Sequence, residues 1–344
     1  MTVIGASQSG AHLGTRPVYS TPLANRKVGI DTLIKLALVG LGSMGANHLR
    51  VAQASPRCAV AKVVDVNLQA ARAAAGDVEV STTVDELADV DAAIIASSTA
   101  SHFELASALL RRRIPLLVEK PLATTAAEVA ALVQLSEEFQ TPLMCGFVER
   151  FNPVVVTSKG LITDELLHVR TQRQSPPPGR SSSNALWDLL IHDLDLVLSY
   201  FPGAPCRSLA AVSAPEGNVA GIEAVEASFE IQGAIVNSTC SRQWQRKVRA
   251  VQLATRTTLL ELDLLRQTLT TYRNISQEQV SEGALIYRAA TTVDVPFVRH
   301  SGEPLRLQLD HFLDLVEGND DAAAERATIL PPHELAESIE ALCA

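Results

Sequence analysis

Asp188 and His192 stand four residues apart in the strongly apolar segment Ala185–Tyr200. Residues at this spacing share one face of a helix, which predicts that Asp188, His192 and also Asp195 point the same way. A carboxylate beside a histidine fixes its tautomer and stabilises its imidazolium form. Such a histidine can take a proton from a hydroxyl group as a general base near neutral pH.

Two other interpretations of this helix face stay open. His192 can be a core histidine whose hydrogen bonds are satisfied inside the fold, or Asp188, His192 and Asp195 can bind a metal ion. A fourth ligand is not evident in the sequence, so no metal is expected. Asp193 lies off this face, and we expect it at the solvent or at an interface.

A glycine-rich loop, GLGSMG, occupies residues 40–45. It follows a short apolar run and opens a predicted helix, and Asp65 lies twenty residues beyond Gly45 at the end of the next predicted strand. This is the context of a dinucleotide-binding fingerprint. Gly40 permits the tight turn, Gly42 lets the backbone approach the pyrophosphate, and Gly45 allows close packing of helix on strand.

The same segment predicts which dinucleotide binds. Phosphate would sit on the free N–H groups at the helix start, around Ser43 and Met44. Asp65 can accept hydrogen bonds from the adenine ribose hydroxyls and would repel a 2′-phosphate, which favours NAD over NADP. The alternative is a glycine-rich turn before an unrelated helix.

A lysine closes another predicted strand, in the segment Glu119-Lys120-Pro121. Open parallel sheets bind their ligands at the carboxyl ends of the strands. Lys120 could there donate a hydrogen bond to a substrate oxygen and to a nicotinamide ribose. The alternative is a solvated lysine before a proline turn.

Two kinds of element must position these residues. Between residues 34 and 147 short apolar strands alternate with helices, which is typical of βαβ units on a parallel sheet. The predicted strands are Lys35–Gly40, Ala59–Asp65, Asp91–Ala96, Ile114–Val118 and Pro142–Met144. Later segments such as Glu223–Ile231 alternate apolar and polar residues, which is typical of a sheet with one wet face. The predicted fold class is an α/β Rossmann domain followed by an α+β domain with an open, mainly antiparallel sheet.

Composition limits the function classes. A chain of 344 residues fits two domains, which we predict as residues 34–147 and 148–344, after a flexible arm formed by residues 1–33. The net charge of −9 argues against nucleic-acid partners, and no apolar run is long enough for a membrane span. Five cysteines without a C-x-x-C pair predict buried thiols in a cytoplasmic protein.

Four motifs in order make the sequence resemble the Gfo/Idh/MocA oxidoreductases over residues 34–344. They are GLGSMG, EKP, GFVERFNP (Gly146–Pro153) and DLLIHDLD (Asp188–Asp195). The resemblance implies a Rossmann domain, a bound nicotinamide cofactor, a sugar or cyclitol substrate, and an open sheet that builds a homodimer or homotetramer. Lys120 matches the catalytic lysine of the EKP segment, and Asp188 and His192 match a D-x-x-x-H pair.

The resemblance also implies further contacts. Glu119 and the stretch after the fourth predicted strand, with Ser97, Thr99 and His102, would contact the cofactor, although serine stands where the family often has proline. Arg150 and Asn152 would contact substrate. Their alternative is a capping residue or an interdomain salt bridge.

The resulting hypothesis is an NAD-dependent dehydrogenase that oxidises a secondary hydroxyl, at C3, of a sugar, amino sugar or nucleotide sugar, or runs the reverse reduction. His192 would remove the proton, Asp188 would orient His192, and Lys120 would hydrogen-bond the reacting oxygen. The stretches VERFNP, WDLLIHDLDLVLSYF and GEPLRLQLDHF resemble the branch of nucleotide-sugar 3-dehydrogenases. The alternatives are an NAD-dependent glycosidase of the same fold and a nicotinamide-sensing regulator without turnover.

A basic cluster surrounds Trp244 and includes Arg242, Arg246, Lys247 and Arg249. It could neutralise a diphosphate while the tryptophan stacks on a base. The favoured interpretation is a solvated edge strand, where lysine and arginine discourage pairing with another chain.

Overall fold

The computed structural model describes residues 33–177, 184–216, 219–281, 284–299 and 302–343, which belong to one compact unit, Leu33–Ala344. The predicted arm at residues 1–33 lies outside the described residues except for its last position. No helix in the described part of the chain is long and apolar enough to cross a bilayer.

The first half of this unit is built on a parallel six-stranded sheet, sheet A, in the order β3-β2-β1-β4-β5-β6. Its strands are β1 (Ile34–Val39), β2 (Cys58–Val64), β3 (Glu79–Ser81), β4 (Ala92–Ile95), β5 (Leu116–Val118) and β6 (Leu143–Cys145). The five predicted strands are confirmed, and β3 is too short to give a sequence pattern. Because the order reverses between β1 and β4, the loops after these two strands open a crevice at the carboxyl edge.

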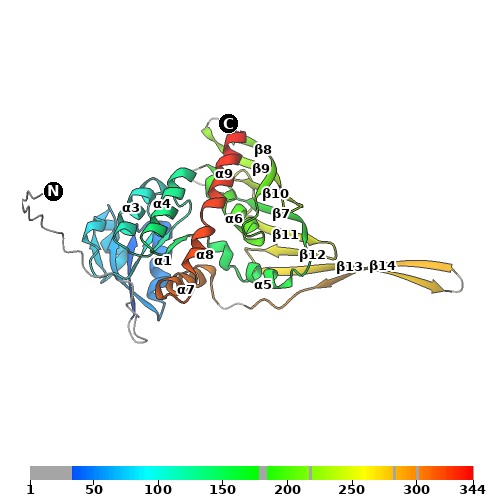
Figure 1. Ribbon diagram of the computed structural model, residues 1–344, viewed down its shortest axis with the longest axis horizontal. Coiled ribbons are helices and arrows are strands. Elements are labelled where there is room, and N and C mark those ends of the chain that lie inside the picture. The colour runs from blue at the N-terminus through cyan, green and yellow to red at the C-terminus, as the bar shows by residue number, and fades with distance from the viewer. Residues whose placement is uncertain (1–32, 178–183, 217–218, 282–283, 300–301, 344) are drawn as a thin grey trace, which may run out of the picture. The chain divides into compact units, whose positions relative to one another are not determined.

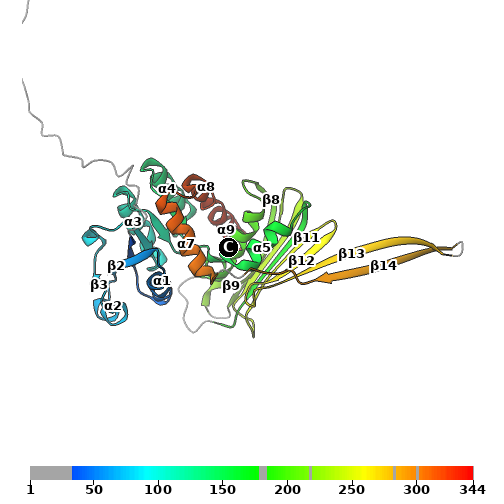
Figure 2. The same ribbon diagram turned by 90° about the horizontal axis from the view of Figure 1, so that it is seen from below.

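Helices cover both faces of sheet A, which explains why its strands are apolar throughout. Leu36 and Leu38 of β1 face the helices α1 (Ser43–Gln53), α2 (Leu68–Ala75) and α7 (Pro304–Glu317). Ala37 and Val39 face α3 (Thr99–Arg111) and α4 (Ala126–Glu138) on the other side. Figure 2 shows the two helix layers. Helix α7 begins with Pro304 at its first position and ends before Gly318, which has a left-handed conformation.

The second half carries an eight-stranded sheet, sheet B, in the order β14-β13-β12-β11-β7-β10-β9-β8. Its strands are β7 (Leu166–Gln174), β8 (Cys206–Glu216), β9 (Val219–Ile231), β10 (Ala234–Ser241), β11 (Val248–Thr255), β12 (Thr258–Asp263), β13 (Thr268–Ser281) and β14 (Ala284–Asp294). Every neighbouring pair is antiparallel except β7 and β10. The predicted fold class is therefore confirmed.

One face of sheet B packs against helices, and the other carries exposed side chains. The covering elements are α5 (Pro153–Leu161), the π-helical turn η3 (Leu186–Leu190), α6 (Ile191–Tyr200) and α9 (Leu330–Cys343). On the far face Ile235 and Val212 are exposed. The two-residue turn Gln232-Gly233 joins β9 to β10, and both residues have positive φ, as such a hairpin turn requires.

Two features of sheet B differ from the sequence pattern. β11 lies between β12 and β7, so the basic cluster at its start is not on an edge strand. β13 pairs with β12 only over Thr268–Arg273, and beyond that it pairs with β14 alone. Figures 1 and 2 show these two strands continuing past the rest of the sheet. The short elements η1 (Val84–Glu86), η2 (Val148–Phe151) and α8 (Ala322–Ala327) complete the structure.

Candidate active site

The Glu119-Lys120-Pro121 segment leaves the carboxyl end of β5 and is held between the neighbouring strands. The N–H of Glu119 donates to the carbonyl oxygen of Ile95 in β4 at 2.8 Å. On the other side the N–H of Gly146, just after β6, donates to the carbonyl oxygen of Val118 at 2.7 Å. The segment therefore continues the sheet hydrogen bonding up to Lys120, and its position is fixed by the strands.

Glu119 is bonded to a histidine of the glycine-loop helix. Nε2 of His48, in α1, lies 2.8 Å from Oε1 of Glu119, and both side chains are buried. Glu119 Oε2 accepts the N–H of Lys120 at 3.2 Å. A Cβ at position 146 would lie 2.9 Å from Oε2 of Glu119, so any residue other than glycine there would displace this carboxylate. The predicted cofactor residue Glu119 thus links α1 to Lys120, and the sequence analysis missed its partner His48.

His102 holds the turn from α3. Its ring is buried, with Nδ1 2.9 Å from the carbonyl oxygen of Pro121 and Nε2 3.2 Å from that of Ser97. Burial lowers the pKa of His102, although both carbonyls favour a proton on the ring. Both nitrogens therefore face backbone carbonyls, and the ring joins the loop after β4 to the Lys120 turn.

His333 holds the turn from α9. Its Nε2 accepts the N–H of Leu122 at 3.0 Å, and its Nδ1 lies 2.7 Å from the carbonyl oxygen of Ile329. Accepting at Nε2 and donating at Nδ1 requires the neutral ring. Burial lowers the pKa of His333 to about 4. No local pattern in the sequence points to His333, because its partner Leu122 is 211 positions away.

Lys120 reaches across to η3 above sheet B. Its Nζ donates to the carbonyl oxygen of Asp188 at 2.7 Å and to Oδ1 of the same residue at 3.2 Å. The lysine side chain is only 16% exposed. Burial lowers the pKa of Lys120, against the opposing effect of Asp188 and Glu119. The lysine is therefore a buried amine whose proton is held less tightly than in water.

Asp188 is shared between two cations. Its second oxygen, Oδ2, accepts a hydrogen bond of 2.8 Å from Nη2 of Arg242. Burial alone would raise the pKa of Asp188, but Lys120 and Arg242 outweigh it and hold that pKa below its usual range. Asp188 is thus a carboxylate throughout the neutral range.

His192 is not bonded to Asp188. Its Nδ1 is buried without a hydrogen-bond partner among the described residues. Burial, together with the charges of Lys120, Arg173 and Arg249, holds the pKa of His192 well below its usual value. The ring is therefore neutral at pH 7, with a buried Nδ1 that no described residue hydrogen-bonds.

Asp195 does not share the helix face of Asp188, so the predicted alignment of Asp188, His192 and Asp195 is wrong for Asp195. Leu186–Leu190 form a π-helical turn, whose i→i+5 hydrogen bonds widen the helix and change which residues lie above one another. Asp188 pairs with Lys120, while Asp195 pairs with Arg150 on another side. No group of three or more His, Cys, Asp or Glu residues in the described part of the chain is placed to hold a metal ion.

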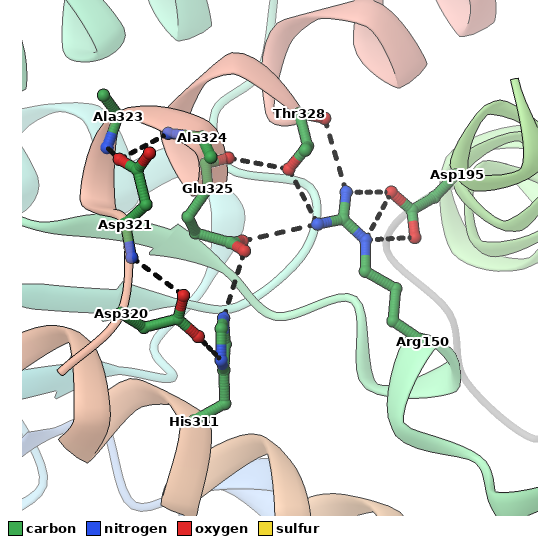
Figure 3. A network of polar contacts seen from close by, with 9 residues as sticks. All are labelled: Arg150, Asp195, His311, Asp320, Asp321, Ala323, Ala324, Glu325 and Thr328. Carbon is green, nitrogen blue, oxygen red and sulfur yellow. Dashed lines mark hydrogen bonds and ion pairs between the residues drawn. The ribbon is translucent and has the colours of Figure 1, made fainter. Parts of the chain in front are cut away.

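Arg150, a predicted substrate contact, is enclosed by protein groups (Figure 3). Its guanidinium makes a bidentate pair with Asp195, and its Nη1 donates to Thr328 Oγ1 at 2.7 Å and to Glu325 at 3.3 Å. Glu325 also lies 3.2 Å from His311, which joins the network to α7. These contacts hold the guanidinium in a salt-bridge network among residues of the second predicted domain, 148–344.

Asn152, the second predicted substrate contact, is also used internally. It is buried and caps α5 by accepting the N–H of Val154 at 3.3 Å. Its amide nitrogen donates to the carbonyl oxygen of Leu264 at 3.0 Å. This placement fits the alternative of a capping residue.

The solvent position predicted for Asp193 is wrong. Asp193 is buried, and its Oδ1 accepts hydrogen bonds of 2.9 and 2.7 Å from Nε and Nη2 of Arg173. Arg173 also donates to Glu149 at 3.0 Å, and Arg249 donates to the same carboxylate at 3.2 Å. Arg173 and Arg249 of this charge network are two of the cations that lower the pKa of His192.

The solvated-edge interpretation of the basic cluster is wrong as well. Arg242 is only 2% exposed, and Arg249 is partly buried against Glu149. Trp244, Arg246 and Lys247 are exposed on the loop between β10 and β11. The cluster is therefore divided between buried ion pairs and an exposed loop.

The glycine loop has the geometry of a phosphate cradle. Gly40 has φ +89°, and a Cβ there would lie 2.5 Å from the backbone nitrogen of Ser97. A Cβ at Gly45 would overlap the carbonyl oxygen of Gly40, whereas one at Gly42 would meet nothing within 4 Å. α1 begins without a side-chain cap or an acidic residue in its first turn, so among the described residues nothing occupies the N–H groups near Ser43, and they can bind an anion.

Asp65 lies beside this loop. Its Oδ2 accepts the N–H of Leu41 at 2.7 Å, and its Oδ1 accepts that of Asn67 at 2.7 Å. It stays partly exposed at the carboxyl end of β2. Of the predicted contacts after β4, Ser97 and Thr99 are also partly exposed. The free N–H groups, the open space at Gly42 and a carboxylate beside the loop together fit the pyrophosphate and ribose of NAD.

A cavity lies away from the Lys120 turn. It has a volume of about 720 Å³, and none of its lining residues is Lys120, Asp188 or His192. It is enclosed by the end of α6, the following turn and α9, with Arg150 and Asp195 at one end. We place the candidate site at the Lys120 turn because the chemistry-bearing groups converge there.

Comparisons with known proteins agree with this geometry. Residues 34–147 match the GFO_IDH_MocA family, described as an oxidoreductase family with an NAD-binding Rossmann fold. An inositol 2-dehydrogenase of Arthrobacter sp. (strain FB24) is 31% identical over 204 residues, which cover 54% of this chain and 60% of that enzyme, less than two thirds of its length. Myo-inositol dehydrogenase Hyg17 of Streptomyces leeuwenhoekii is 30% identical over 234 residues, 61% of this chain and 70% of that protein.

The solved structure of UDP-N-acetylglucosamine 3-dehydrogenase GnnA from Acidithiobacillus ferrooxidans superposes with a TM-score of 0.78. The match covers 91% of this chain and 98% of that one at 22% identity, which establishes a common fold. The fold, the phosphate cradle and the sequence matches agree with the resemblance carried by the four motifs. The chain belongs to the Gfo/Idh/MocA oxidoreductase family, whose Rossmann domain binds NAD.

Proposed function

We propose that this chain is an NAD-dependent dehydrogenase that oxidises a secondary hydroxyl of a sugar-type substrate to a ketone, or runs the reverse reduction. The observation that carries the proposal is the contact of Lys120, at the carboxyl edge of sheet A, with Asp188, four residues before His192, whose buried Nδ1 has no hydrogen-bond partner among the described residues. The glycine loop opens at the same edge, after β1. A hydroxyl placed between them would face two groups able to handle its proton.

The cofactor site in this proposal uses the loop geometry. The backbone around Gly40, Gly42, Ser43 and Met44 would hold the pyrophosphate, and Asp65 would accept the adenine ribose hydroxyls. When bound, NAD accepts the hydride from the carbon that carries the hydroxyl. The negative charge of Asp65 beside the loop would repel the 2′-phosphate of NADP, which supports NAD as the cofactor.

Lys120 would position the reacting oxygen. Its ammonium points at Asp188, and a substrate hydroxyl entering the site would take one of its hydrogen bonds. As the hydroxyl becomes a carbonyl, negative charge develops on this oxygen and a fixed donor stabilises it. Glu119 and the histidines at positions 48, 102 and 333 would keep the lysine in place.

His192 would accept the hydroxyl proton. A neutral ring can take a proton, and the depressed pKa of His192 keeps it neutral at pH 7. The nearby cations that keep it neutral also make it release that proton readily. One hydride and one proton leave the alcohol, and a ketone remains.

The substrate is best described by its class. The relatives that match this chain are named for inositol and for UDP-N-acetylglucosamine, both of which carry ring hydroxyls. A ring secondary hydroxyl, C3 of a sugar, amino sugar or nucleotide sugar, is the specific proposal. The exposed Arg246 and Lys247 support a phosphorylated member of this class, since both are free of the buried ion pairs.

The assembly forms a separate part of the proposal. Residues 34–147 would form the cofactor domain and residues 148–344 the substrate and oligomerisation domain. The far face of sheet B exposes Val212, Ile235 and Val293, which supports a homodimer or homotetramer through this face. The five free cysteines support a reducing, cytoplasmic location.

The direct test is the absorbance of NADH after the protein and NAD are mixed with myo-inositol, free amino sugars and UDP-N-acetylglucosamine. NADH formation with at least one of them supports the proposal. Release of a cleaved glycoside without net NADH would identify an NAD-dependent glycosidase instead. Tight NAD binding without turnover on the whole panel would identify a regulator.

A further inference from the structure

We infer that Arg242 is a positioning residue that holds the Asp188 carboxylate against Lys120. The inference rests on the proposed function, in which Lys120 faces the reacting hydroxyl. Nothing in the family motifs points to Arg242, which directly follows β10 and precedes an exposed loop.

Arg242 is fixed before it reaches Asp188. Its backbone N–H donates to the carbonyl oxygen of Glu223 at 2.9 Å, and its Nη1 lies 3.4 Å from Oε1 of the same residue. Its Nη2 donates to the carbonyl oxygen of Asn184 at 3.1 Å. The side chain is 2% exposed, so the guanidinium has one position from which to bind Asp188.

The Asp188 carboxylate is divided between its two partners. Oδ1 lies 3.2 Å from Nζ of Lys120, and Oδ2 lies 2.8 Å from Nη2 of Arg242. A carboxylate held by a second cation attracts the first one less strongly. Arg242 therefore weakens the hold of Asp188 on the proton of Lys120, while its rigid fork orients the carboxylate.

The other charges around Lys120 do not replace this effect. Glu119 attracts the lysine proton from the same turn, and Arg173 of β7 repels it. His192, from α6, is neutral and adds no charge at pH 7. Without Arg242, the Asp188 carboxylate would pair with Lys120 only and attract its proton more strongly, so the pKa of Lys120 would rise. Loss of the Asp188 charge would lower it.

These opposite signs define the experiment. The rate at which a small amine-directed acylating reagent modifies Lys120 is followed against pH in the full-length protein, by mass spectrometry of the peptide that contains it. We expect Arg242→Gln to move this titration up by about 0.5–1 pH unit and Asp188→Asn to move it down. The double variant should follow Asp188→Asn, because Arg242 acts through Asp188.

Kinetics give the second readout. We expect Arg242→Gln to lower kcat roughly tenfold to a hundredfold, as loss of an orienting partner typically does, while the Kd for NAD changes less than about twofold. Arg242→Lys, which keeps the charge, should recover part of kcat. Glu223→Gln is the matched control: it removes the longer ion pair of Arg242 and leaves Asp188 untouched, so its kcat and titration should stay near the wild-type values.

Thermal unfolding establishes that each variant is folded. Should Arg242→Gln not fold, Arg242→Lys serves in its place, because a single ammonium cannot contact Asn184, Glu223 and Asp188 together, and its titration should shift in the same direction. An unchanged titration and an unchanged kcat in the folded variant would overturn the inference. Full activity of Lys120→Ala would instead overturn the proposed function, so the two failures are distinct.

Discussion

Nε2 of His333, in α9, accepts a hydrogen bond of 3.0 Å from the backbone N–H of Leu122, two residues after Lys120. Nδ1 of the same ring lies 2.7 Å from the carbonyl oxygen of Ile329. The ring can make both bonds only when it is neutral. The C-terminal helix is thus tied to the Lys120 turn by a contact that acid breaks.

This contact predicts a pH dependence of stability. Burial lowers the pKa of His333 in the folded protein to about 4, below the ordinary value of 6.5. The unfolded state therefore binds more protons between these values, and the contribution of His333 is complete above about pH 6.5 and disappears toward pH 4. The loss corresponds to about 3 kcal/mol.

Urea unfolding of wild type and His333→Gln at pH 7 and pH 4.5 measures this loss. The difference in unfolding free energy between the two proteins should be large at pH 7 and shrink at pH 4.5. The matched control is His168→Gln on the exposed face of sheet B, which should track wild type at both pH values. If the unfolding free energies of wild type and His333→Gln differ by the same amount at both pH values, the neutral His333 ring does not account for the pH dependence.

Two glycines of the phosphate loop should respond differently to alanine. Gly42 has open space where a Cβ would be, so Gly42→Ala should fold with near-normal stability and bind NAD at least tenfold more weakly by occupying the cradle. A Cβ at Gly45 would overlap the carbonyl oxygen of Gly40, so Gly45→Ala should lower the melting temperature as well. Calorimetric unfolding and NAD titration separate the two. Equal NAD affinity in Gly42→Ala and wild type would rule out the cradle.

Asp65→Asn tests the choice of cofactor. Asparagine keeps an acceptor for the N–H of Leu41 but removes the charge that opposes a 2′-phosphate. We expect the ratio of kcat/KM for NADP to that for NAD to rise at least tenfold, which is about 1.4 kcal/mol. Steady-state rates with both cofactors measure the ratio. No change in it would show that Asp65 does not face the ribose.

The buried ion pair of Arg173 and Asp193 should contribute to the free energy of unfolding. Neither residue is proposed to bind the substrate. Asp193→Asn would leave a buried guanidinium short of its partner charge, which typically costs about 3–5 kcal/mol. Asp263→Asn breaks an exposed pair with Arg266 and should cost less than about 1 kcal/mol. Urea unfolding compares them. Equal effects would mean that the buried network adds nothing beyond a surface pair.

The sequence predicts the sheets better than the contacts of the site. The alternating segment Glu223–Ile231 lies within β9 (Val219–Ile231) as predicted, because apolar alternation is a local signal. The glycine loop and Lys120 also lie where the motifs indicate. His48 and His333 could not be predicted, since each meets the Lys120 turn from more than 70 positions away.

Asp188 and Arg242 show why the charged partners could not be predicted. Helical spacing paired Asp188 with His192, yet the π-helical turn redirects it and leaves it to Lys120 and Arg242. Arg242 resembled a surface residue because four basic residues cluster near Trp244. Strand order, which places β11 inside the sheet, is a long-range property that the local pattern does not contain.

In the proposed function, hydride transfer takes place where Lys120 and His192 face the substrate hydroxyl. It is tested most directly by turnover of Lys120→Ala and His192→Ala with NAD and the best substrate of the panel, alongside NAD binding by titration. We expect kcat to fall at least a hundredfold in each variant while the Kd for NAD stays within about threefold of wild type. Near-normal turnover in both folded variants would contradict the claim.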